Sequence, residues 1–153
     1  MSNITTVILA AGKSSRFKGS ISKLLFPLCG LPIISHIYEV ARKISGKNII
    51  VVCNEDNITE LKPILKNCKF VIQKKQLGTA HALEQTKNKI NTENILVLFG
   101  DTPLIETSNL KKLIKKFNSS KSIASIIAFK TANPYGYGRI INDNKKVKEI
   151  IEE

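Results

Sequence analysis

The sequence predicts an α/β fold, in which a mostly parallel sheet carries helices on both faces and a β-hairpin follows. Three observations predict it. Short apolar runs recur along the chain, and they lack the polar alternation of half-exposed strands. Segments with a helical spacing of apolar residues separate these runs, and this alternation implies parallel strands joined by helices. Near the end, Arg139–Ile141 and Val147–Ile151 flank a polar turn, as the two strands of a hairpin do.

Five apolar runs are the predicted strands, and helical patterns fall between them. Pro32–Ile44 places its apolar residues on one stripe and has proline in its first turn. A later helix begins after Thr107 or Ser108, because either residue suits an N-cap. The helical pattern of Asn57–Leu65 is interrupted by Pro63. The predicted strands are Thr6–Ala10, Ile49–Cys53, Phe70–Ile72, Ile95–Phe99 and Ile123–Phe129.

Length and composition narrow the class of protein. The chain has 153 residues, which predicts one domain over residues 1–153, and 42% of them are apolar, enough for a core. No run of about 18 apolar residues and no secretory signal pattern is present, so we expect a cytoplasmic protein without a membrane partner. The three cysteines are widely spaced and form no Cys-x-x-Cys pair, which argues against a zinc site or a disulfide framework.

The net charge of +12 has two interpretations. It can mark an anionic partner such as a nucleotide, a sugar phosphate or a nucleic acid. It can also follow from a lysine-rich composition that places lysine on every exposed face. We favour composition as the main cause and expect no nucleic-acid partner, because arginine leads in base recognition and the chain has few arginines. The charge would still attract anionic substrates.

The stretch Val7–Phe17 has the character of a phosphate-binding turn. An apolar run ends in a loop of small residues that contains Gly12 and the cations Lys13 and Arg16. Glycine lets backbone N–H groups approach phosphate oxygens, and the cations neutralise them. The loop matches neither Gly-x-Gly-x-x-Gly nor the P-loop motif, so a nicotinamide or flavin cofactor and a P-loop NTPase are not expected.

Two further polar groups follow predicted strands, and the carboxyl ends of parallel strands meet at one edge of a sheet. One group comprises Gln73 and the run 76–81, and the other comprises Gly100–Pro103. Asp101 in the second group is suited to hold Mg²⁺ together with phosphates, although aspartate also begins ordinary turns. The three groups together predict a ligand site at this edge.

Some residues of the second and third groups have structural alternatives. Gly78 and Thr79 open a helix expected over Thr79–Ile90, where free N–H groups could meet an anion or a base edge, or where Thr79 is an ordinary N-cap. We interpret His81 as a packing or surface residue rather than an acid or base. His36, on the Pro32–Ile44 helix, is also interpreted as structural.

Taken together, these residues resemble the nucleotidyltransferases that make activated sugars. The opening stretch is similar to their Leu-Ala-Ala-Gly-x-Gly-x-Arg motif, followed downstream by a lysine. Three further runs are similar to the uridyltransferase domain of bacterial bifunctional N-acetylglucosamine-1-phosphate uridyltransferases/glucosamine-1-phosphate acetyltransferases. These runs are Gln-Leu-Gly-Thr-Ala-His-Ala (76–82), Gly-Asp-Thr-Pro-Leu (100–104) and Pro-Tyr-Gly-Tyr-Gly-Arg-Ile (134–140). The match runs in order from about residue 6 to the last residue, and it implies a Rossmann-like fold.

The resemblance implies a reaction and roles for individual residues. The phosphate of an amino-sugar 1-phosphate attacks the α-phosphate of UTP, and pyrophosphate leaves, with Mg²⁺ as cofactor. Arg16 would bind the leaving pyrophosphate, Lys23 the α-phosphate, and Asp101 the metal. Gly138 and Glu152 would contact the amino sugar. The residues implied to lie along the nucleotide are Leu9, Ala10, Ala11, Gly12, Gln73, Gly78 and Thr79, of which Gln73 and Gly78 would read the uracil edge.

The chain departs from this pattern in two ways. Ser14 stands where the motif has its second glycine. The family's domain continues well past the position of Glu152, and the acetyltransferase β-helix follows it. We therefore interpret the chain as a truncated or split uridyltransferase domain without the acetyltransferase. The alternative is a nucleotide-binding remnant without turnover, or one half of an enzyme that a second polypeptide completes.

Overall fold

The computed structural model describes residues 4–12, 22–143 and 146–151. The chain divides into two compact units, residues 1–112 and residues 113–153. Helix α4 (Thr107–Asn118) crosses the boundary between them. The two units are described separately below.

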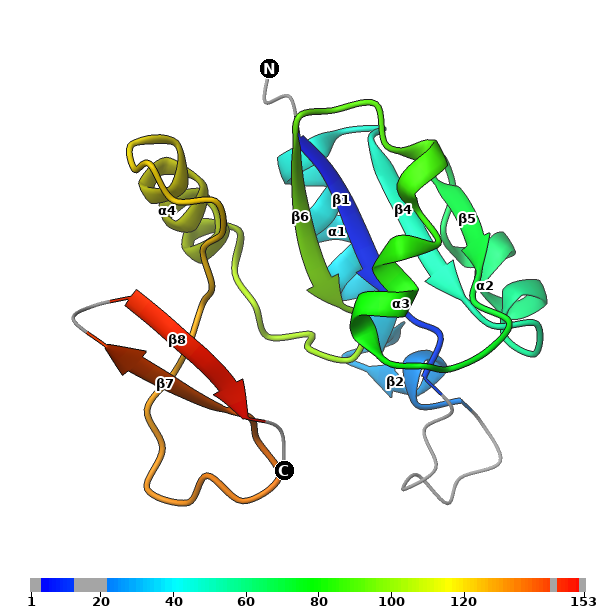
Figure 1. Ribbon diagram of the computed structural model, residues 1–153. Helices are drawn as coiled ribbons and strands as arrows, with labels where there is room; N and C mark the ends of the chain where they lie inside the picture. Colours follow the sequence, from blue (N-terminus) through cyan, green and yellow to red (C-terminus); the bar gives the residue numbers. More distant parts are fainter. Residues whose placement is uncertain (1–3, 13–21, 144–145, 152–153) are drawn as a thin grey trace. The chain divides into compact units, whose positions relative to one another are not determined.

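The first unit is built on a four-stranded parallel sheet (Figure 1). Its strands lie in the order β5-β4-β1-β6, and β1 pairs with β4 on one side and β6 on the other. In this register Thr6 lies opposite Ile49 and Leu96. The predicted parallel sheet is confirmed, with four of the predicted strands at nearly the predicted positions. The strands are β1 (Ile4–Leu9), β4 (Ile49–Cys53), β5 (Lys69–Ile72) and β6 (Asn94–Phe99).

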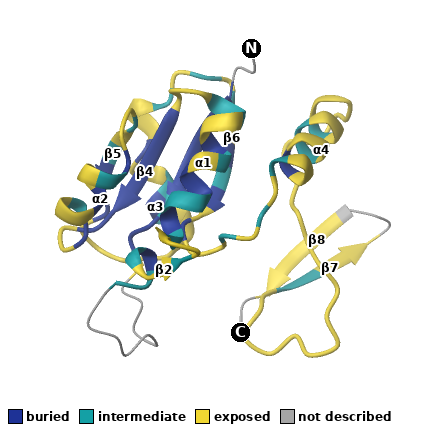
Figure 2. Ribbon diagram, turned by 180° about the vertical axis from the view of Figure 1, so that it is seen from behind, coloured by how far each residue is buried: buried dark blue, intermediate teal, exposed yellow. Residues whose placement is uncertain are grey.

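Helices cover both faces of the sheet. Helix α1 (Ile33–Ser45) packs behind the sheet in Figure 1 and helix α3 (Thr79–Glu84) packs in front, and both contact β1. The short helix α2 (Ile58–Ile64) connects β4 to β5 and carries Pro63 in its last turn. The two central strands are therefore buried on both sides, which explains why their sequences show no polar alternation (Figure 2).

The predicted helix over Thr79–Ile90 is wrong in its second half. Helix α3 ends at Glu84, and the 3₁₀ turn η2 (Lys87–Lys89) follows. Thr86 Oγ1 donates a hydrogen bond to the carbonyl of Leu83 at 2.6 Å, and the Thr86 amide donates to the same carbonyl at 3.0 Å. Threonine thus closes a tighter turn with its own side chain and stops the α-helix.

A small hairpin precedes α1. Strands β2 (Pro27–Leu28) and β3 (Leu31–Pro32) follow the 3₁₀ turn η1 (Lys23–Leu25), and the two residues between the strands both have positive φ. The His36 ring Nε2 lies 2.9 Å from the Leu28 carbonyl, so His36 ties α1 to this hairpin. The structural interpretation of His36 agrees with this contact.

The second unit contains a predicted hairpin and lacks a predicted strand. Strands β7 (Arg139–Asp143) and β8 (Lys146–Ile151) pair in antiparallel fashion, as expected. Ile123–Phe129 is irregular, so the prediction of a strand there is wrong. A strand needs a partner to satisfy its backbone groups, and the two strands of this unit pair with each other. Phe129 instead packs edge-to-face on Tyr137, with ring centroids 5.0 Å apart.

None of the helices in the described part of the chain is both long and apolar enough to cross a membrane.

Candidate functional site

The order of the strands places a topological switch point at the carboxyl end of β1. From β1 the chain adds β4 and β5 on one side of the sheet, and then β6 on the other. The strand order therefore reverses between β1 and β6, and ligands of open α/β sheets bind beyond the strand ends at such a point. The loop after β1 begins here with Ala10, and the loop after β6 begins with Gly100.

A row of backbone hydrogen bonds joins the strand ends along this edge. The Gly100 amide donates to the Leu9 carbonyl at 2.9 Å, and the Ala10 amide donates to the Val52 carbonyl at 2.7 Å. At the far end, the Gln73 amide donates to the Cys53 carbonyl at 2.8 Å. The three polar groups predicted from the sequence therefore begin on one continuous edge of the sheet.

Lys23 and Asp101 form an ion pair at this edge. Lys23 Nζ donates to Asp101 Oδ2 at 2.9 Å, from the turn η1 to the loop after β6. Both side chains remain about two-fifths exposed, at 41% and 42%. Thr102 Oγ1 caps the turn that carries Asp101 by donating to the Phe99 carbonyl at 2.9 Å. The turn given above as the alternative role of Asp101 is thus present, and the ion pair with Lys23 is a contact that the sequence did not predict.

Gly100 provides close approach between the two strand ends. A Cβ atom at this position would lie 3.2 Å from the Leu9 carbonyl oxygen and 3.2 Å from Leu24 Cδ2. Leu24 is buried and belongs to η1, next to Lys23. The missing side chain of Gly100 therefore lets β6, β1 and η1 meet, and this meeting brings Lys23 to Asp101.

The first loop is held by two asparagines that the sequence analysis missed. Asn57 Nδ2 donates to the Ala10 carbonyl at 2.8 Å, and Asn54 Nδ2 donates to the Ala11 carbonyl at 3.2 Å. The two asparagines also bind each other, because the backbone amide of each donates to the side-chain oxygen of the other at 2.8 and 3.0 Å. Both are buried. A polar residue directly after the buried strand Ile49–Cys53 is the sequence feature that could have indicated them.

Ala10 and Ala11 are buried and Gly12 is exposed, so the loop emerges into solvent at the glycine. Leu9, the last residue of β1, is partly buried. The predicted nucleotide contacts of this loop therefore begin at the end of a rigid strand. Arg16, which carries the pyrophosphate prediction, lies outside the described residues, as does Glu152.

Gln73 is a buried polar residue with a dense set of partners. Its side-chain Nε2 lies 3.2 Å from the Gly78 carbonyl and 2.9 Å from His81 Nδ1. Its own carbonyl accepts from Gln76 Nε2 at 3.3 Å. The interpretation of His81 as a packing or surface residue missed this contact. His81 occupies the third position of α3, where its ring reaches back to the residue that follows β5.

Gly78 and Thr79 lie exposed at the start of α3. Gly78 has φ +96°, a conformation that disfavours any side chain, and no other atoms crowd the position. Thr79 makes no side-chain capping bond to the helix, because the cap position belongs to Gly78. Gly138, predicted to contact the sugar, belongs to the second unit and is exposed there.

A divalent cation fits this edge only as an ion shared with a substrate. Within the described residues, no three His, Cys, Asp or Glu side chains are grouped so that they could hold a metal ion. Mg²⁺ is commonly bound by one or two carboxylates together with substrate phosphates. Asp101 provides one such carboxylate, and its Oδ1 has no hydrogen bond from the described residues. The donor set thus suits a metal ion that arrives with a nucleotide.

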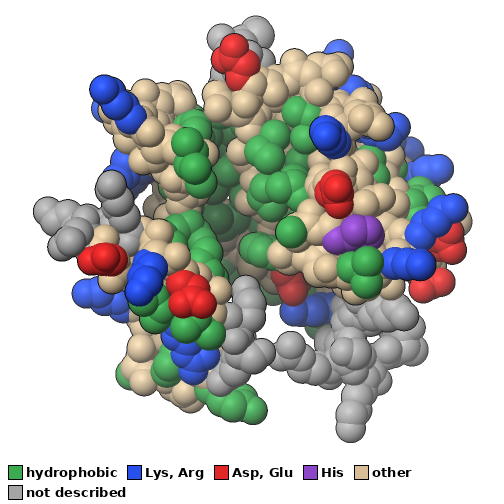
Figure 3. All heavy atoms as spheres, viewed as in Figure 1, with side chains coloured by type: hydrophobic (Ala, Val, Ile, Leu, Met, Phe, Trp, Pro, Cys, Tyr) green, Lys and Arg blue, Asp and Glu red, His purple; other side chains and the backbone are tan. Residues whose placement is uncertain are grey.

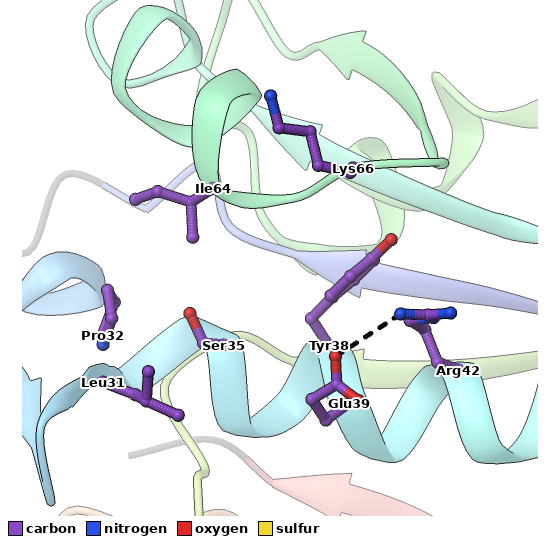
Figure 4. Close-up of a pocket in the computed structure, with 8 residues that line it drawn as sticks. All are labelled: Leu31, Pro32, Ser35, Tyr38, Glu39, Arg42, Ile64 and Lys66. Carbon is purple, nitrogen blue, oxygen red and sulfur yellow. Dashed lines mark ion pairs between the residues drawn. The ribbon is translucent and has the colours of Figure 1, made fainter.

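A cavity of about 390 Å³ lies elsewhere, beside α1 and the end of α2 (Figure 4). It is lined by Leu31, Tyr38, Arg42 and Ile64, among others, and contains none of the predicted site residues. The Tyr38 ring rises from α1, and its hydroxyl is the one buried side-chain polar atom of the described residues that lacks a hydrogen-bond partner. Burial raises the pKa of Tyr38 above its usual value.

Charge is spread over the surface. Figure 3 shows lysine and arginine side chains on both units of the face in view, without a single concentrated patch. The described residues contain two ion pairs, Lys23–Asp101 and Glu39–Arg42. This distribution agrees with a lysine-rich composition as the main source of the net charge of +12.

Comparison with protein families gives one match over most of the chain. Residues 6–142 match the model of the MobA-like NTP transferase domain. Among curated proteins, the chain is 36% identical to the bifunctional protein GlmU of Clostridioides difficile over 99% of its length. It is 43% identical to GlmU of Buchnera aphidicola subsp. Acyrthosiphon pisum over 98% of its length. The chain spans about a third of the length of these relatives, 33% in both cases.

Solved structures share the fold. A protein assigned as a glucose-1-phosphate thymidylyltransferase from Bacillus anthracis superposes with a TM-score of 0.86 at 21% identity, over 97% of this chain and 64% of that one. Rv0371c from Mycobacterium tuberculosis, solved with manganese, superposes with a TM-score of 0.62 at 20% identity over 77% of this chain and 61% of that one. At these identities the likeness concerns the fold alone.

Proposed function

The chain belongs to the family of MobA-like NTP transferase domains, and on this basis we propose that it transfers a uridylyl group from UTP to N-acetylglucosamine 1-phosphate. The products would be UDP-N-acetylglucosamine, a precursor of peptidoglycan, and pyrophosphate. The similarity to GlmU over 98–99% of the chain supports this choice of substrates. A cytoplasmic location is part of the proposal, because both substrates would be drawn from that compartment.

The observation that carries the proposal is the Lys23–Asp101 ion pair at the switch point between β1 and β6. A cation and a carboxylate side by side are what a triphosphate with its metal ion requires. We assign the α-phosphate to Lys23 and a divalent ion, Mg²⁺ or Mn²⁺, to Asp101. Such an ion neutralises charge on the phosphates when it is bound.

The reaction needs little covalent chemistry from the protein. An oxygen of the sugar phosphate forms a bond to the α-phosphorus, and the bond from that phosphorus to the β-phosphate oxygen breaks. The chain would therefore act by positioning and by neutralising charge. We assign the nucleoside and phosphates to Leu9, Ala10, Ala11 and Gly12, and the departing pyrophosphate to Arg16.

We assign the base to the loop between β5 and α3. The buried Gln73, the exposed Gly78 and the neighbouring Thr79 would lie along the uracil edge. Gly138 and Glu152 remain the proposed contacts to the amino sugar. These roles rest on the motifs that the chain shares with its relatives.

Pyrophosphate release tests the proposal directly. The full chain is incubated with UTP, N-acetylglucosamine 1-phosphate and Mg²⁺, and release is followed over time. Lys23→Gln should slow turnover by roughly a hundredfold, the usual loss when one charge-stabilising donor is removed. Lys43→Gln, which removes the same charge from an exposed position on α1, should leave the rate unchanged. A folded chain that releases no pyrophosphate above background refutes turnover.

A second candidate is nucleotide binding without turnover, either by the chain alone or with a second polypeptide that completes the site. It is favoured because the described residues group no three His, Cys, Asp or Glu side chains that could hold a metal ion. It predicts that UTP raises the thermal stability of the chain, that Arg16→Ala abolishes the effect, and that no product forms. RNA binding that depends on salt and is not displaced by UTP would instead indicate a nucleic-acid protein.

A further inference from the structure

The side chain of Gln73 has one polar atom with which no described residue forms a hydrogen bond. Four hydrogen bonds hold the residue. Its backbone amide donates to the Cys53 carbonyl, and its backbone carbonyl accepts from Gln76 Nε2. Its side-chain Nε2 donates to the Gly78 carbonyl and to His81 Nδ1. The side chain is buried, with 4% of the residue exposed. No hydrogen bond to Oε1 comes from the residues that the structure describes.

The carbonyl of Gly78 determines which way the Gln73 amide faces. A carbonyl oxygen can only accept hydrogen bonds, so the amide atom 3.2 Å from it must be the nitrogen, Nε2. The second hydrogen of Nε2 then points to His81 Nδ1 at 2.9 Å. Both donors of the amide are thereby occupied, and the acceptor Oε1 remains for a ligand.

This arrangement also fixes the state of His81. Because Nε2 of Gln73 donates, His81 Nδ1 must accept, and the single proton of the neutral ring lies on its Nε2. That proton faces Gln85 Nε2 at 3.2 Å, and the same amide nitrogen donates to the His81 carbonyl at 3.2 Å. Because Gln85 is exposed, its amide can give up the carbonyl contact to water and turn its oxygen toward the ring. The buried contact to Gln73 therefore sets the tautomer of the His81 ring, and the exposed side chain of Gln85 adapts to it.

We propose that His81 is a positioning residue that, with the Gly78 carbonyl, locks the Gln73 amide so that only Oε1 faces the base, and so selects uracil or thymine over cytosine. The inference rests on the proposed function, because it assumes that the base lies at Gln73. An imide base offers an N3–H donor to Oε1. Cytosine offers an unprotonated N3, which would leave two acceptors facing each other, and such a mismatch is costly in a buried site.

The first test measures nucleotide selectivity in the whole chain. We expect the wild-type chain to bind UTP more tightly than CTP by roughly tenfold, the factor that one unsatisfied buried polar contact produces. His81→Leu removes the acceptor for Gln73 and should reduce this ratio by about threefold or more. His81→Asn, whose side-chain oxygen can replace Nδ1, should restore it. His36→Leu removes the other histidine, which is remote from Gln73, and should leave the ratio unchanged.

The second test determines the tautomer of the His81 ring in the absence of any nucleotide. The ¹⁵N chemical shifts of the His81 ring should show an unprotonated Nδ1 and a protonated Nε2 in the free chain. A proton on Nδ1 would overturn the lock, whatever the chain binds. A UTP/CTP ratio that is the same in the wild-type chain and in folded His81→Leu would overturn the selectivity. Failure of the wild-type chain to bind any triphosphate would instead overturn the proposed function, and the ring shifts would still decide whether the lock exists.

Discussion

Lys23 Nζ lies 2.9 Å from Asp101 Oδ2, although 78 residues separate them along the chain. In the free chain, the cation proposed for a phosphate and the carboxylate proposed for a metal ion therefore neutralise each other. A nucleotide that arrives with its metal ion would provide each with a new partner. Lys23 and Asp101 would then exchange each other for new partners without either charge being left unpaired, which lowers the free-energy cost of binding.

Asp101→Asn should weaken metal-dependent UTP binding without unfolding the chain. The loss of affinity should be roughly ten- to hundredfold, as for other changes that disturb a metal site. The stability should change by less than about 1 kcal/mol, because an ion pair this exposed contributes little. Calorimetric titration of UTP with and without Mg²⁺ and a thermal melt check the two parts. Equal UTP affinity in the variant and the wild-type chain would remove Asp101 from the metal site.

Asn57→Ala should destabilise the chain by about 2 kcal/mol, because it leaves buried polar groups of Asn54 and Ala10 without partners. It should also weaken UTP binding, since the Ala10 carbonyl would no longer be held. Urea denaturation measures the first effect. Asn88→Ala removes an asparagine from an exposed position on η2 and should leave the stability nearly unchanged. Similar stabilities for the two variants would argue against the bracing role of Asn57.

Gly100→Ala should destabilise the chain by roughly 1–3 kcal/mol, the usual range for overpacking. The added Cβ would press on the Leu9 carbonyl at 3.2 Å, and a backbone atom cannot move aside cheaply. The shift should also separate Lys23 from Asp101. Gly12→Ala is the matched control, because no atom of the described residues lies within 4 Å of a Cβ there. The melting temperatures of the two variants are measured and compared. Equal values would contradict the predicted crowding at Gly100.

The free energy of unfolding should fall as pH rises from about 9 to about 11. Burial raises the pKa of Cys53 and of Cys68 to about 11, from an ordinary value of 9.0. Across this interval the unfolded chain releases thiol protons that the folded chain keeps, so the unfolded state gains stability with pH. Urea denaturation at a series of pH values measures the slope.

Lysine residues titrate in the same interval, so the thiol effect needs a difference measurement. The double variant Cys53→Ala/Cys68→Ala should show a smaller fall in stability over the interval than the wild-type chain. Cys29→Ala removes an exposed thiol and should keep the wild-type slope. Parallel slopes for the double variant and the wild-type chain would mean that the Cys53 and Cys68 thiols ionise as readily in the folded state as in the unfolded state.

The sheet could be predicted from the sequence because its strands are apolar runs, and the two central ones are buried on both faces. Runs such as Ile49–Cys53 contain only apolar residues, and the observed strand has the predicted bounds. Ile123–Phe129 is also mostly apolar, yet it is irregular. Composition indicates that a segment can form a strand, whereas a strand also needs a neighbour with which to pair. The sequence does not show which neighbours are present.

The edge that carries the site could be predicted, but not how its parts are held. Polar residues after apolar runs indicated Gln73 and Asp101, since parallel strands end together. Asn57 braces Ala10 from another loop, and Gln73 in the loop after β5 meets His81 of helix α3. Asparagine and histidine in loops are common, and only the folded chain reveals which carbonyl or amide each one meets.

The reciprocal contact between Asn54 and Asn57 has a consequence for how this chain can evolve. Each asparagine satisfies the other, so a change at one position leaves the other with an unmet requirement. A substitution at only one of the two positions should therefore be selected against. A tolerated change would have to replace both asparagines at once and still supply the hydrogen bonds to the carbonyls of Ala10 and Ala11. Few single substitutions at these two positions should therefore preserve the hydrogen bonds that hold the loop after β1.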